Sequence, residues 1–204
     1  MALNQDEYVM QWAKDRAEVL AYPSTWIGVL RLVLLAGALY WAHLPAVFVG
    51  FVTLSVGLDL VDGWLARRLG QAGRFGEVLD YGIDLITHTV LWVLSGFPFA
   101  PVLILLEWGA GFSVLWFSFR HPDHWKTLLM QAHPFLWRYF ANGQRNFLAA
   151  WAVCSHFAFR IVWYLGHGET WAADIALGGT IVFEVVTAYM IWLPLRAKFA
   201  QRSP

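Results

Sequence analysis

Four carboxylates lie close together in a part of the sequence that is otherwise apolar. They are Asp59, Asp62, Asp80 and Asp84. The first two are three residues apart and the last two are four apart, so each pair shares one face if its segment is helical. Carboxylates are costly within a membrane unless they pair with cations or face a polar cavity. Two such helices facing each other would form a cluster of oxygen donors suited to hard divalent cations.

Small and basic residues accompany these acids. Gly63 follows Asp59 by four residues and Ala66 follows Asp62 by four, so another helix or a flat ligand can approach that face closely. Arg67 lies one turn further, where its guanidinium could bind a phosphate through two hydrogen bonds. The pattern favours a site in which two metal ions clamp a pyrophosphate. A carboxylate less fully used by metal could accept a proton from an attacking hydroxyl.

The composition predicts an all-α, polytopic membrane protein. The 204 residues are 59% hydrophobic and 14% charged, with a mean hydropathy of +0.52, whereas soluble domains average about 25% charged residues. Thirteen Trp and seven Tyr residues suit anchors at two membrane interfaces. The formal net charge is zero, so no global field favours nucleic acid as a partner.

Six apolar segments are expected to cross the membrane, several near the short end of the roughly 17–25 residues required. The expected spans are 25–42, 45–66, 77–96, 99–119, 146–166 and 172–195. Residues 4–21 fit an amphipathic helix on the membrane surface, and the polar stretch 120–145 should be a loop with short helices. We expect one domain over 1–204, with a juxtamembrane helix in 1–22, a bundle in 25–195 and a tail in 196–204.

Basic residues predict the orientation of the spans. They gather before the first span, between the second and third, between the fourth and fifth, and after the sixth. The positive-inside rule therefore places both termini and the acidic segment on the cytoplasmic side. This predicts an integral protein of the endoplasmic reticulum in a eukaryote, or of the inner membrane in a bacterium.

The acidic segment resembles the signature of the CDP-alcohol phosphotransferases, Asp-x2-Asp-Gly-x2-Ala-Arg-x8-Gly-x3-Asp-x3-Asp. Every specified position is filled, by Asp59, Asp62, Gly63, Ala66, Arg67, Gly76, Asp80 and Asp84. The six-span architecture of that family, with a surface helix before the first span, also looks like this chain. The resemblance further suggests a homodimer among membrane lipids.

The resemblance implies a role for each of these residues. The four aspartates would hold two Mg²⁺ or Mn²⁺ ions on the pyrophosphate of a CDP-linked lipid, and Asp84 would also be the general base. Gly63, Ala66 and Gly76 would make room for the cytidine, and Arg67 would contact phosphate. The acceptor hydroxyl would attack the β-phosphorus, and CMP would leave.

Two further segments resemble the phosphatidylinositol synthases of this family. Residues 27–31, ending at Arg31, are similar to their Ile-Gly-Tyr-x-Arg, and residues 133–145 are similar to their Asn-Pro-x-Leu-Arg-x-Tyr-Tyr-x-x-Arg. By this resemblance Arg138 and Arg145 line the pocket near the acceptor or the lipid phosphate. Arg74 begins a segment, 74–80, that is shared widely across the whole family, and it joins the substrate-binding residues. Arg31 either contacts phosphate or extends its charge to the membrane surface. The favoured substrates are CDP-diacylglycerol and myo-inositol.

Other functions stay open at this point. Leu85 follows Asp84, where phosphatidylglycerophosphate synthases usually have Lys and eukaryotic phosphatidylinositol synthases usually have Arg. Glycerol 3-phosphate or another polar alcohol is therefore an alternative acceptor, and cation transport is the non-enzymatic alternative. Glu107 and Glu184, isolated in apolar spans, are expected to pair with an arginine or to face the polar cavity. His88 is expected to have a packing role, because hard cations prefer oxygen ligands.

Overall fold

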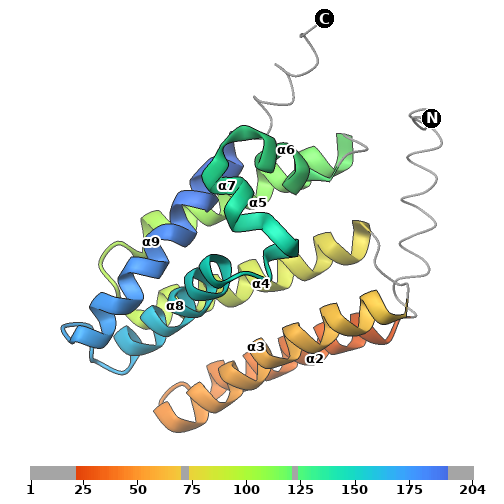
Figure 1. The fold of residues 1–204 in the computed structure, drawn as a ribbon. Helices are drawn as coiled ribbons and strands as arrows, with labels where there is room; N and C mark the ends of the chain where they lie inside the picture. The colour runs from red at the N-terminus through yellow and green to blue at the C-terminus, as the bar shows by residue number, and fades with distance from the viewer. Residues whose placement is uncertain (1–21, 70–73, 121–123, 193–204) are drawn as a thin grey trace, which may run out of the picture. The chain divides into compact units, whose positions relative to one another are not determined.

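The computed structural model describes residues 22–69, 74–120 and 124–192. Within these ranges the chain is helical and contains no strand (Figure 1), which confirms the all-α prediction. The surface helix expected in 4–21 and the tail expected in 196–204 lie outside the described residues.

Six of the helices are long and apolar enough to cross a membrane, by length and composition. The expected spans are confirmed, with ends that differ by a few residues. The observed segments are Pro23–Tyr40, Pro45–Leu65, Val78–Ser95, Ala100–Arg120, Phe147–Tyr164 and Trp171–Ile191. These are the features of an integral membrane protein.

The chain divides into two compact units, residues 1–87 and 88–204. The first contains α2 (Pro23–Tyr40), α3 (Pro45–Arg68) and the first part of α4 (Arg74–Ser95). The second contains the rest of α4 followed by α5 (Ala100–Arg120), α6 (Trp125–Ala132), α7 (Pro134–Phe140), η1 (Ala141–Gln144), α8 (Phe147–Tyr164) and α9 (Trp171–Ile191). The expectation of one domain over 1–204 stays a prediction.

In the first unit α2 packs along α3, to which a four-residue connection joins it (Figure 1). Pro23 occupies the first turn of α2, where its missing N–H costs no helical hydrogen bond. Glycines let the helices approach closely. A Cβ on Gly37 would lie 3.1 Å from the Phe51 ring, and a Cβ on Gly28 would lie 2.9 Å from Ile83 Cδ1. The register of α2 against α3 and α4 is thereby constrained near the acidic residues.

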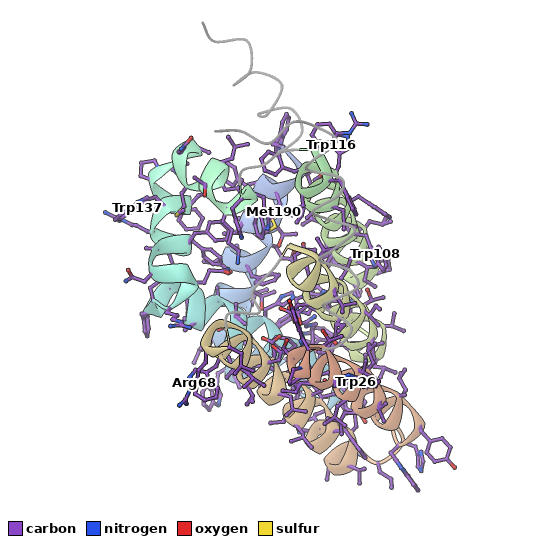
Figure 2. The ribbon with its side chains drawn as sticks, turned by 90° about the vertical axis from the view of Figure 1, so that its right-hand side faces the viewer. Trp26, Arg68, Trp108, Trp116, Trp137 and Met190 are labelled. Carbon is purple, nitrogen blue, oxygen red and sulfur yellow. The ribbon has the colours of Figure 1, made fainter. Side chains whose placement is uncertain are left out.

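In the second unit α9 packs against both α5 and α8. A Cβ on Gly179 would lie 2.4 Å from Ser155 Cβ, so the backbones of α8 and α9 come together where both side chains are small. The polar stretch before α8 folds into α6, α7 and η1, which confirms the prediction of a loop with short helices. Trp137 projects outward from α7, whereas Met190 of α9 lies in the apolar core (Figure 2).

Candidate active site

The four acidic side chains of the first unit converge on one cation, the guanidinium of Arg31 in the middle of α2. Asp59 and Asp62 come from the last turns of α3, and Asp80 and Asp84 from the first turns of α4. Arg31 Nη1 lies 2.7 Å from Asp59 Oδ1, 2.7 Å from Asp80 Oδ1 and 3.4 Å from Asp62 Oδ2, and Nη2 donates to Asp84 Oδ1. The two sequence pairs therefore form a single cluster.

One side of the cluster is buried in the unit, and the opposite side is partly exposed. Arg31 is 2% exposed and the Asp62 side chain 9%, whereas the Asp80 side chain is 45% exposed and those of Asp59 and Asp84 about a third. Arg31 is thus enclosed in the helix packing and does not extend to the membrane surface. A ligand that reaches this unit would meet carboxylate oxygens first.

A hydrogen bond fixes α2 beside α3 at the level of this cluster. The Ser55 hydroxyl donates to the backbone oxygen of Arg31 over 3.2 Å, and Ser55 lies one turn before Asp59 on α3. Gly28, three residues before Arg31, allows the close approach of Ile83, the neighbour of Asp84. Small and hydroxyl residues next to the charged ones therefore bring the three helices into register.

The donor set suits a hard divalent cation. Oxygen atoms of Asp59, Asp62 and Asp80 all lie within 4.8 Å of one another, and Mg²⁺ and Mn²⁺ prefer carboxylate oxygen. Four carboxylates facing one guanidinium leave an excess of negative formal charge, which additional cations would neutralise. The residues present thus fit the predicted metal site.

The other predicted site residues divide between the two units. Gly63 and Gly76 are half-buried, and a Cβ added at Gly76 would meet no atom within 4 Å. Ala66 and Arg67 lie in α3 and Arg74 begins α4, but their side chains are outside the described part of the structure. Arg138, in α7, and Arg145, after η1, belong to the second unit and are exposed.

A second polar cluster was only partly anticipated from the sequence. Glu107 accepts a hydrogen bond from Trp92 Nε1 and lies beside His88 and His156, rather than pairing with an arginine. Glu184 lies 3.6 Å from His156 Nδ1 and likewise has no arginine or lysine ion pair among the described residues. His156 gave no signal in the sequence, because a single histidine in an apolar helix shares no short spacing with the acids.

The fold and the site define a class: a helical membrane protein whose clustered carboxylates suit divalent ions and phosphate. A family model described as CDP-alcohol phosphatidyltransferase matches residues 21–186. This chain belongs to the CDP-alcohol phosphatidyltransferase family, and the predicted resemblance is confirmed.

Two curated proteins of Arabidopsis thaliana are similar to parts of the chain. CDP-diacylglycerol–inositol 3-phosphatidyltransferase 1 is 32% identical over 95 residues, which cover 46% of this chain and 41% of the relative. Probable CDP-diacylglycerol–inositol 3-phosphatidyltransferase 2 is 39% identical over 49 residues, which cover 24% of this chain and 22% of the relative. The chain thus matches less than half the length of either relative. No solved structure matches it at a significant level.

Proposed function

We propose that this protein transfers the phosphatidyl group of CDP-diacylglycerol to a hydroxyl of myo-inositol, giving phosphatidylinositol and CMP. The observation that carries the proposal is the convergence of all four motif carboxylates on a single cation. Membership of the family supports the type of reaction. The names of the two Arabidopsis thaliana relatives support inositol as the acceptor.

The carboxylates would hold two ions, Mg²⁺ or Mn²⁺, which when bound neutralise the pyrophosphate and the departing phosphate. Asp84 would take the proton from the inositol hydroxyl. The hydroxyl oxygen forms a bond to the β-phosphorus, the bond from that phosphorus to the bridging oxygen breaks, and CMP leaves with the bridging oxygen. The contact between Arg31 and Asp84 would hold that carboxylate in place.

The remaining predicted residues have roles in substrate binding. Gly63, Ala66 and Gly76 would leave space for the cytidine, while Arg67 and Arg74 contact phosphate. Arg138 and Arg145 would bind the acceptor or the lipid phosphate. Arg31 would act on the substrate phosphate through the four carboxylates that it contacts. The site would face the cytoplasm, and the protein would act as a homodimer.

A panel of radiolabelled acceptors tests the choice of substrate. Purified protein in detergent is supplied with CDP-diacylglycerol, Mg²⁺ or Mn²⁺, and either myo-inositol or glycerol 3-phosphate. We expect label in lipid from inositol, matched by CMP release that stops when the metal is chelated. Label from glycerol 3-phosphate instead would assign the alternative acceptor. Ion flux by the protein in sealed liposomes, without CMP release, would indicate transport.

The proposed base is tested by Asp84→Asn, which keeps the shape of the side chain and removes its basicity. We expect turnover to fall by about 10²–10⁴-fold or more, with an unchanged elution profile. Asp174→Asn, at an exposed position in the first turn of α9, is the matched control and should keep full activity. Wild-type turnover in Asp84→Asn would remove Asp84 as the base.

A further inference from the structure

The second unit brings together one polar residue from each of four helices: His88 of α4, Glu107 of α5, His156 of α8 and Glu184 of α9. Glu107 lies between the two imidazoles. Its Oε2 is 3.1 Å from His88 Nδ1, and its Oε1 is 3.2 Å from His156 Nε2. One ligand atom from each of these three residues lies within 4.8 Å of the others.

This cluster is enclosed in the unit. His156 is 0% exposed, Glu107 2% and His88 9%. Neither ring nitrogen of His156 has a hydrogen bond of acceptable geometry in the described structure, and both oxygens of Glu184 are likewise buried without one. Buried polar atoms are normally satisfied, and one of these four atoms, His156 Nε2, faces Glu107 in the cluster, where a bound ion would partner it.

The nearby cation does not supply that partner. Arg160 is fully buried, but its Nε donates to the backbone oxygen of His156 over 2.9 Å and its Nη1 to that of His88 over 3.3 Å. The structure shows no ion pair between Arg160 and either carboxylate, Glu107 or Glu184.

The geometry suits a transition-metal ion. Two imidazoles and one carboxylate are an established ligand set for Zn²⁺, and imidazole favours Zn²⁺ over the hard ions that carboxylates attract. Two ligands about 2.0–2.2 Å from a tetrahedral ion lie roughly 3.4 Å apart. Glu107 presents a different oxygen to each ring, Oε2 at 3.1 Å from His88 Nδ1 and Oε1 at 3.2 Å from His156 Nε2, so an ion between the imidazoles would be held by both oxygens.

The surroundings resemble those of a metal site. A histidine that binds a metal usually donates its other ring N–H to a carboxylate. The carboxylate beside His156 Nδ1 is Glu184, whose Oε1 lies 3.6 Å away, just beyond hydrogen-bond distance. Trp92 Nε1 donates to Glu107 Oε1 over 2.7 Å, which orients the carboxylate. Phe183 stacks on the His156 ring with centroids 4.0 Å apart and holds its plane.

We propose that His88, Glu107 and His156 bind a Zn²⁺ ion, with Glu184 orienting His156, and that this ion joins α4, α5, α8 and α9. We assign the site a structural role, because its three ligands are buried. It differs in chemistry from the four-aspartate cluster, which offers oxygen donors only. The proposal does not depend on the transfer reaction, so either can fail without the other.

Metal analysis of the full-length protein tests this site. Protein purified in detergent is loaded with Zn²⁺, washed with a chelator to remove loosely held ions, and analysed by inductively coupled plasma mass spectrometry. We expect about one equivalent of zinc in the wild type, in Asp84→Asn and in the exposed matched control His167→Gln. His156→Gln and His88→Gln should retain little zinc under the same wash.

Two further measurements keep the outcome decisive if a histidine variant fails to fold. X-ray absorption at the zinc edge of the wild type should show scattering from two imidazoles, and Glu184→Gln should weaken zinc binding by about 10–100-fold. A wild type without zinc above the buffer level would overturn the proposal. So would zinc retained in His156→Gln, or a spectrum with oxygen ligands alone.

Discussion

Replacing Arg31 by methionine should destabilise the metal-free protein and increase the stabilisation that divalent ions provide. Methionine keeps an unbranched apolar chain but removes the one charge that all four carboxylates contact. Breaking a buried ion pair costs about 3–5 kcal/mol. Because three of the carboxylates are a third or more exposed, solvent screens part of the repulsion, and we expect about 2–3 kcal/mol.

Thermal unfolding in detergent measures both effects. At about 2–4 °C per kcal/mol for a chain of this size, Arg31→Met should lower Tm by roughly 4–12 °C in the presence of a chelator. An ion at 100 times its Kd stabilises by about 2.7 kcal/mol. We expect Mg²⁺ or Mn²⁺ to raise Tm more in Arg31→Met than in the wild type, because the guanidinium no longer competes for the same oxygens.

The matched control is Arg120→Met, an exposed arginine that stacks on Trp116 at the end of α5. It should lose about 1 kcal/mol or less and respond to divalent ions as the wild type does. Equal increases in Tm with Mg²⁺ in Arg31→Met and the wild type would refute the reasoning. That result would show that the guanidinium and the metal ion do not compete for the same carboxylate oxygens.

Two further pairs of variants test the packing of the second unit. Asn146 accepts from Ala149 N–H at the start of α8 and donates to the backbone oxygens of Tyr139 and Ala141. Asn146→Ala should therefore cost about 1–2 kcal/mol, visible as a lower Tm. Asn146→Asp keeps the acceptor but loses both donated hydrogen bonds, so it should lower Tm as well. Gly179→Ala places a Cβ 2.4 Å from Ser155 Cβ and should lower Tm clearly, whereas Gly178→Ala, whose Cβ meets only the Trp151 ring at 3.5 Å, should not. A Tm in Gly179→Ala equal to that of Gly178→Ala would contradict the close approach of α8 and α9.

The spans and their order could be predicted because each depends on local composition. A run of about 20 apolar residues that crosses a membrane alone must be helical, because the helix is the conformation in which one segment makes all of its own backbone hydrogen bonds. The short helices before α8 were harder to define, because their limits depend on side-chain caps. His124 accepts from Lys126 N–H and His133 from Phe135 N–H.

The carboxylate cluster could be predicted in outline but not in detail. Asp59 and Asp62 are three residues apart, and Asp80 and Asp84 four apart, so helical geometry alone aligns each pair. That the pairs meet, and that Arg31 lies between them, depends on the packing of α2 against α3 and α4. Ser55 and Gly28 control that packing, and neither carries a chemical signal of its own in the sequence.

The histidine and glutamate cluster shows why some sites remain hidden in a sequence. His88, Glu107, His156 and Glu184 each come from a different helix, so no short spacing relates them and each appears as an isolated polar residue in an apolar segment. Burying one such residue alone is unfavourable, and a stable bundle therefore has to bring the polar residues of several helices together. An isolated polar residue in one span therefore predicts that other spans also carry polar residues with which it can pack. Only the packed bundle shows which of them meet, and whether they satisfy each other or leave room for an ion.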